Sequence, residues 1–188
     1  MRRLLFATLV VFAIAFPARA DFLGWDYNWS VSPPTINSVT GAPALKLQGN
    51  NGNSTATQES IIAAALTPLA GNSTPISPTP YTLTLTLTDD ASSNSGTLTF
   101  GGNVSGSIGN LANSFNSPTT QNLVLGNTNY TVTIGPYFKP SAILPGIIGA
   151  SVETAPATHD APEPASFALA ACALPGLALA ALRRRRAR

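Results

Sequence analysis

Tyr81-Thr82-Leu83-Thr84-Leu85-Thr86-Leu87-Thr88 is the stretch of sequence that decides the fold. Threonine alternates with an apolar residue without interruption across these eight positions. A period of two predicts a half-buried β-strand, with the leucines facing a core and the β-branched threonines facing solvent. Residues 89–94 then predict a turn, and residues 96–100 predict the strand that returns beside the first.

Short alternating segments recur on both sides of this hairpin. Further strands are predicted at 44–48, 60–66, 104–108, 121–125, 129–134 and 146–152. Residues 61–66 could equally form a short helix, because Ile and Ala continue there without polar interruption. Seven or eight short antiparallel strands with one apolar face each predict an all-β fold, a β-sandwich over residues 21–153. That length of chain is sufficient for a hydrophobic core of its own.

The N-terminal residues 1–20 predict a signal peptide. Met1-Arg2-Arg3 is a short positive segment, residues 4–16 are apolar except for Thr8, and Ala18-Arg19-Ala20 provides the small residues that a signal peptidase requires. A retained anchor is the alternative, but a segment of 13 residues forms a helix of only about 20 Å, against a hydrocarbon core of about 30 Å. We therefore expect export through the Sec machinery and cleavage by signal peptidase after Ala20.

The C-terminal residues predict a second membrane segment. Residues 165–182 carry no charge and would span about 27 Å as a single transmembrane helix, and Arg183, Arg184, Arg185 and Arg186 follow as a cytoplasmic stop. Before this helix, residues 154–160 form a Pro-containing linker, and Pro162-Glu163-Pro164 is expected to be extended and accessible.

These three C-terminal parts, in this order, resemble the PEP-CTERM sorting signal of exported bacterial proteins, and the resemblance covers residues 161–188. It implies an exosortase-type membrane protease as partner, which recognises Pro162, Glu163 and Pro164 and cuts nearby. The protein would be a single-pass inner-membrane intermediate first, and then reside at the envelope surface or outside the cell. The alternative is an ordinary tail anchor in which Pro-Glu-Pro occurs by chance.

The domain between the two membrane signals also resembles a β-sandwich found in PEP-CTERM proteins of planctomycete-like bacteria. Residues 81–89, 95–101 and 119–137 carry the likeness: a Leu-Thr strand, a Gly-Thr-Leu-Thr-Phe strand, and a Leu-x-Leu-Gly-Asn hairpin. The likeness implies no enzymatic activity.

The charge pattern excludes one class of partner. Eight of the ten basic residues lie in the two terminal segments, and only Lys46 and Lys139 lie between them. The central domain is therefore mildly acidic, and it lacks the clustered Lys and Arg that neutralise nucleic-acid phosphates. We expect no nucleic-acid partner.

Few residues are available for catalysis or metal binding. His159 is the only histidine and Cys172 the only cysteine, which excludes a His-based triad and a multi-His metal site within one chain. Asp89 and Asp90 could form a catalytic pair or part of a Ca²⁺ site, but a hairpin turn capped by Asp side chains explains them more simply. Glu59 and Glu153 could join Asp89 in a hydrolase, although no motif supports it. We predict no catalytic residues, no metal and no cofactor.

Trp25, Tyr27 and Trp29 alternate, so on a strand they would share one face. Three such aromatic rings could form a platform for sugar stacking, or they could be the core face of a strand that closes the sandwich. Asn-x-Ser/Thr sequons occur at Asn28, Asn53, Asn72, Asn103 and Asn129.

Two classes of function follow from the sequence. The first is a non-enzymatic protein of the cell surface or extracellular matrix. The second is a carbohydrate-binding module for exopolysaccharide that uses the Trp25–Trp29 strand.

Overall fold

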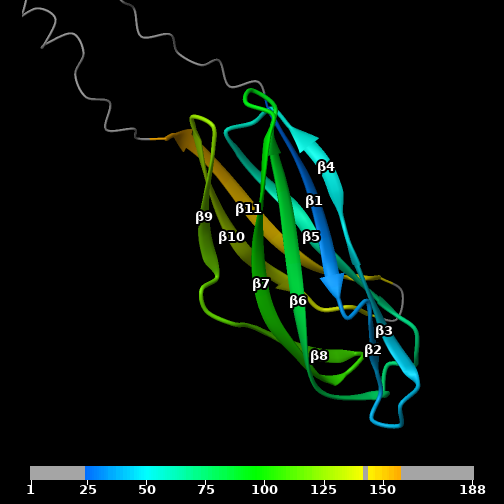
Figure 1. Ribbon diagram of the computed structural model, residues 1–188. Coiled ribbons are helices and arrows are strands. Elements are labelled where there is room, and N and C mark those ends of the chain that lie inside the picture. The colour runs from blue at the N-terminus through cyan, green and yellow to red at the C-terminus, as the bar shows by residue number, and fades with distance from the viewer. Residues whose placement is uncertain (1–23, 142–143, 158–188) are drawn as a thin grey trace, which may run out of the picture. The chain divides into compact units, whose positions relative to one another are not determined.

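The computed structural model describes residues 24–141 and 144–157, and this part of the chain is all-β, as predicted (Figure 1). Its eleven strands outnumber the seven or eight expected, and two of them contain 15 and 14 residues. Their bounds are β1 Trp25–Ser32, β2 Thr35–Asn37, β3 Pro43–Gly49, β4 Asn51–Ser54, β5 Gln58–Pro68, β6 Pro75–Asp89, β7 Asn94–Ser107, β8 Asn110–Phe115, β9 Thr120–Leu125, β10 Thr128–Phe138 and β11 Gly146–Pro156.

The strands form two antiparallel sheets. One sheet has the order β4-β1-β6-β7-β8, and the other has the order β2-β3-β5-β11-β10-β9. Their inner faces share one hydrophobic core. Leu83, Leu85 and Leu87 of β6 are completely buried in it, while the threonines between them are only half-buried, as their alternation predicted.

The central hairpin confirms the prediction, and its two strands are longer than predicted. Strands β6 and β7 pair with Leu83 opposite Phe100 and Leu85 opposite Leu98. The segments predicted as separate strands at 96–100 and 104–108 form one continuous strand, β7. Gly102 allows this continuity because the Tyr81 ring crosses its α-carbon: a β-carbon there would lie 2.3 Å from the ring.

The remaining predicted strands are also present, and residues 60–66 belong to a strand rather than a helix. Strand β11 continues to Pro156, and the Thr154 amide donates to the Thr57 carbonyl at 2.7 Å, so the sheet includes the first residues of the predicted linker. Strands β2, β4 and β8 were not predicted, because they are short or lack an apolar alternation.

One bent hairpin joins the two sheets along one side. Strand β4 pairs with β1 in the first sheet, and β3 pairs with β2 in the second. Between these pairings, the Trp29 amide donates to the Asn50 carbonyl and the Leu47 amide to the Pro34 carbonyl, both at 2.8 Å. The hairpin thus changes sheets without losing its partner, which is how corners form in packed sheets. At Gly49 a β-carbon would lie 1.9 Å from the Trp29 carbonyl oxygen, so only glycine fits this crossing.

Strands β1 to β10, strand β11 up to Ala155 and the core lie within one compact unit, which ends at Ala155. The residues around the predicted signal-peptidase site, the Pro-Glu-Pro motif, the span 165–182 and the arginine cluster lie outside the described residues. Within the described residues, no helix is long and apolar enough to cross a membrane.

Candidate functional site

The two tryptophans proposed for sugar stacking belong to the core. Trp25 is 0% exposed and Trp29 is 3% exposed. The Trp25 ring meets Tyr130 edge-on with centroids 6.4 Å apart, and its Nε1 donates to the Ala56 carbonyl at 3.1 Å. Trp29 packs against Phe100 with centroids 5.9 Å apart. Their ring faces are therefore closed to a sugar ring, and the core interpretation of this strand is the one that the structure supports.

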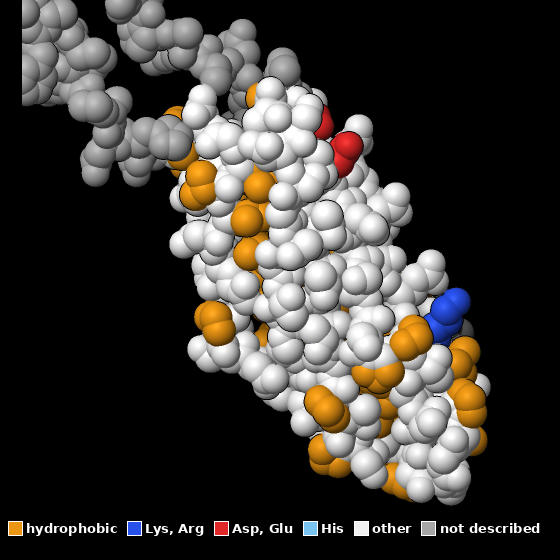
Figure 2. All heavy atoms as spheres, viewed as in Figure 1, with side chains coloured by type: hydrophobic (Ala, Val, Ile, Leu, Met, Phe, Trp, Pro, Cys, Tyr) orange, Lys and Arg blue, Asp and Glu red, His pale blue; other side chains and the backbone are white. Residues whose placement is uncertain are grey.

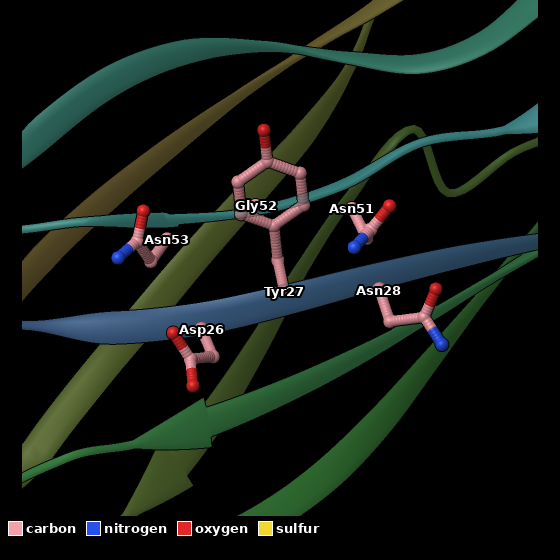
Figure 3. Close-up of a pocket in the computed structure, with 6 residues that line it drawn as sticks. All are labelled: Asp26, Tyr27, Asn28, Asn51, Gly52 and Asn53. Carbon is pink, nitrogen blue, oxygen red and sulfur yellow. The ribbon is translucent and has the colours of Figure 1, made fainter.

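Tyr27 lies at the margin of this core and is only half-buried. Its ring crosses Gly52 on the edge strand β4, where a β-carbon would lie 2.7 Å from the hydroxyl (Figure 3). Burial raises the pKa of Tyr27, and the nearby Glu59 carboxylate raises it further. Tyr27 is thus the only member of the predicted aromatic face that reaches solvent.

A depression in the surface lies over β1 and β4, and the Tyr27 ring points away from the Asp26 and Asn28 side chains there (Figure 3). Cross-strand pairing places Asp26 opposite Asn53 and Asn28 opposite Asn51, and all four side chains are exposed. Each amide can both donate and accept hydrogen bonds and the Asp26 carboxylate can accept them, so this lining suits a neutral, hydroxyl-rich ligand better than an anionic one. This group could not be predicted from the sequence, because β4 has no periodicity that would identify it as a strand.

Asp89 caps a turn, and its carboxylate is fully engaged in the fold. It is 1% exposed; the Tyr130 hydroxyl donates to Oδ1 at 2.7 Å, and the Ser92 amide donates to Oδ2 at 2.8 Å. Burial would raise the pKa of Asp89, but hydrogen bonds from Ser92, Tyr130 and Thr128 together outweigh burial and lower the pKa. Asp90 is exposed whereas Asp89 is buried, so the two carboxylates do not lie together in one cleft. The turn interpretation of Asp89 is therefore correct.

The other two carboxylates considered for hydrolysis do not join Asp89 in a site. Glu153 accepts a hydrogen bond from Gln58 at 3.0 Å on the exposed end of β11, and Glu59 pairs with Val152. Among the residues that the structure describes, no group of three or more His, Cys, Asp or Glu side chains could hold a metal ion.

Three tyrosine hydroxyls, those of Tyr81, Tyr130 and Tyr137, donate hydrogen bonds within the domain. Burial raises the pKa of Tyr137 to about 12. Burial also raises the pKa of Tyr81, although the hydrogen bond to Asn113 at 2.7 Å opposes the increase. For Tyr130, burial and then the hydrogen bond to Asp89 raise the pKa. All three hydroxyls therefore stay protonated at neutral pH and serve as hydrogen-bond donors within the fold.

The structure separates the five sequons into two groups. Asn28, Asn53 and Asn72 are exposed, while Asn103 and Asn129 are half-buried, each with a buried Oδ1 that has no hydrogen-bond partner. The exposed group alone offers its side-chain amides to a modifying enzyme on the folded domain.

The comparisons with known proteins give no match: no family model fits the chain, and no curated protein and no solved structure is detectably similar to it.

Proposed function

We propose that the chain is an exported, non-enzymatic β-sandwich protein of the cell envelope or extracellular matrix, processed by an exosortase-type protease. The observation that carries this proposal is the order of three sequence parts at the C-terminus. Pro162-Glu163-Pro164 precedes an uncharged stretch at 165–182, and four arginines follow it. Strand β11 ends at Pro156, so the motif follows the last strand of the domain after a short connection.

The described domain supports a structural rather than a catalytic role through the state of its carboxylates. Asp89, the most deeply buried of them, has its oxygens occupied by Tyr130 and Ser92. A general acid or base needs a free oxygen within reach of a substrate. Glu59 pairs with Val152 and Glu153 pairs with Gln58, so the two glutamates project from opposite faces of the sheet, whereas glycoside hydrolysis requires two carboxyl groups that face one cleft.

The intact mass of the protein, recovered from its host by cell fraction, tests the proposal. A mass that begins at Asp21 and ends near Pro162–Pro164, in the envelope or medium, supports processing. The substitution Glu163→Ala should then leave a full-length form in the membrane fraction, whereas the control Asp160→Ala should be processed normally. A wild-type protein that retains Arg188 in the membrane would show instead that the C-terminus is a permanent anchor.

A second candidate function, binding of a neutral polysaccharide, is favoured by the amide-lined depression rather than by the tryptophans. Asn28 and Asn51 lie side by side there with exposed side chains. The double substitution Asn28→Ala and Asn51→Ala should weaken binding to the host exopolysaccharide, while Thr97→Ala, exposed on β7, should not. Equal binding by all three proteins would contradict this candidate.

A further inference from the structure

The charged side chains of the described domain are separated into two opposite ends. The end where β1 begins and β11 finishes carries all the described carboxylates, and we call it the acidic end; its residues are Asp26, Glu59, Asp89, Asp90 and Glu153. The opposite end carries both lysines, and we call it the lysine tip. Lys46 pairs with Thr35 and Thr67 near the start of β3, and Lys139 follows the end of β10.

Hydrogen bonds join two loops of the lysine tip to neighbouring strands. The Leu69 amide after β5 donates to the Ala44 carbonyl of β3 at 2.8 Å. The Val39 amide in the β2–β3 turn donates to the Pro75 carbonyl at the start of β6, at 3.2 Å. The two sheets therefore meet at this end, and the strand ends of the second sheet form its rim.

This rim also exposes large apolar side chains. Val39, Leu69, Phe138 and Leu144 are each more than half exposed, and they come from four successive places along the β2-β3-β5-β11-β10 order. Only two other large apolar side chains of the described residues are exposed, Ile62 and Val124. Single exposed apolar residues are common, but four at the strand ends of one sheet, at the same end as both lysines, indicate an interaction surface. Figure 2 shows hydrophobic side chains gathered at the end of the domain that lies away from the red carboxylates.

We propose that the lysine tip binds the surface of an anionic lipid bilayer. Lysines attract acidic headgroups while their aliphatic stems remain among apolar neighbours, and the exposed Val, Leu and Phe side chains would enter the interface. The acidic end is repelled by the same surface, so the charge separation orients the domain with its tip toward the lipid. This inference depends on the described domain alone and does not rest on the proposed sorting.

A second copy of the chain fits the tip less well. Two tips face to face would bring lysines of like charge together. Head-to-tail contact would satisfy the charges, but the acidic end offers only Val124 as an exposed large apolar residue to cover the four at the tip. A lipid interface satisfies both the charge and the apolar surface.

Vesicle sedimentation tests the proposal with residues 21–157, a fragment that contains every strand and the whole core. Near-UV circular dichroism and a cooperative urea transition first establish that it is folded; if it is not, the protein isolated from the host replaces it. We expect binding to vesicles of equal phosphatidylcholine and phosphatidylglycerol, weak binding to phosphatidylcholine alone, and loss of binding at about 1 M salt, where charges are screened beyond about 3 Å.

Two sets of variants identify the surface. The double substitution Lys46→Gln with Lys139→Gln should weaken binding to the anionic vesicles by up to about thirtyfold. The reason is that each lysine contributes one electrostatic attraction to the anionic headgroups. The single substitution Val39→Ser should also weaken binding to the anionic vesicles, whereas Val124→Ser should not. The two valines are a matched pair because each is 56% exposed, at opposite ends of the domain.

Three results would overturn the proposal. The first is a folded protein that does not sediment with anionic vesicles. The second is equal weakening by Val39→Ser and Val124→Ser. The third is concentration-dependent self-association without lipid that Val39→Ser abolishes, which would show that the tip contacts a second copy.

Discussion

The acidic end and the lysine tip of the domain differ in the side chains that they bury and expose. At the acidic end, even a carboxylate, Asp89, is 1% exposed and hydrogen-bonded, and the neighbouring Trp25 is completely buried. At the lysine tip, large apolar side chains such as Leu69 and Phe138 remain in solvent. Trp25 and Asp89 thus show that side chains at the end of a strand can be buried in this fold. The exposed side chains of the tip therefore contribute little to the core.

The largest expected effect on stability is at the most deeply buried residue of the acidic end. Trp25→Ala should lower the free energy of unfolding by about 3–5 kcal/mol, because it removes a fully buried ring and leaves a cavity beside Tyr130. Urea titration followed by far-UV circular dichroism measures the loss. A cost below about 1 kcal/mol would contradict the burial of Trp25 and reopen the question of a surface aromatic platform.

Asp89→Ala should have the next largest effect, about 3 kcal/mol, because it leaves the Tyr130 hydroxyl and the Ser92 amide without their acceptor. Asp90→Ala is the control, since Asp90 is exposed in the same turn. We expect its effect to stay within about 0.5 kcal/mol. Equal effects of the two substitutions would mean that the turn, rather than the buried carboxylate, determines the stability of this end.

The pH dependence of stability sharpens the same comparison. The folded-state pKa of Asp89 is lower than the ordinary value of about 4, so the unfolded chain binds this proton more readily. The contribution of Asp89 is fully present above about pH 4 and is lost as the pH falls through the folded-state pKa. Urea midpoints between neutral and strongly acidic pH should decrease in the wild type and decrease less in Asp89→Asn. Parallel pH profiles would contradict this assignment.

The smallest expected effect on stability is at the tip. Leu69→Ser should change the free energy of unfolding by no more than about 0.5 kcal/mol, because the side chain is already more than half exposed. Retention on a hydrophobic interaction column should nevertheless decrease. A loss of stability comparable to that of Asp89→Ala would show that the tip contributes to the core, and would remove the contrast between the two ends.

The strongest sequence patterns predicted their strands well. The Leu-Thr alternation of residues 81–88 forms the C-terminal half of β6, because a period of two places every leucine on one face of any strand. The strands β2 and β4 could not be predicted, since Asn51-Gly52-Asn53-Ser54 has no apolar alternation and exists as a strand only through its pairing with β1. The amide-lined depression between β1 and β4 was missed for the same reason.

The aromatic segment shows where a local pattern has two interpretations. The alternation of Trp25, Tyr27 and Trp29 determined that they share a face, but not whether that face meets solvent or the second sheet. The second sheet decided this, through contacts such as that of Trp25 with Tyr130, which is 105 positions away by subtraction of the residue numbers.

The sequence by itself therefore determined the all-β class, the main hairpins and the small number of basic residues in the central domain, because these depend on local periodicity and on the positions of charges along the chain. Only the tertiary structure decided that the hairpin of β1 to β4 crosses between the sheets and that carboxylates and lysines lie at opposite ends. Lys46 and Lys139 are 93 positions apart by the same subtraction, and only strand pairing brings their ends of the sheet together. Strand order and register are set by long-range packing, which no short segment of sequence contains.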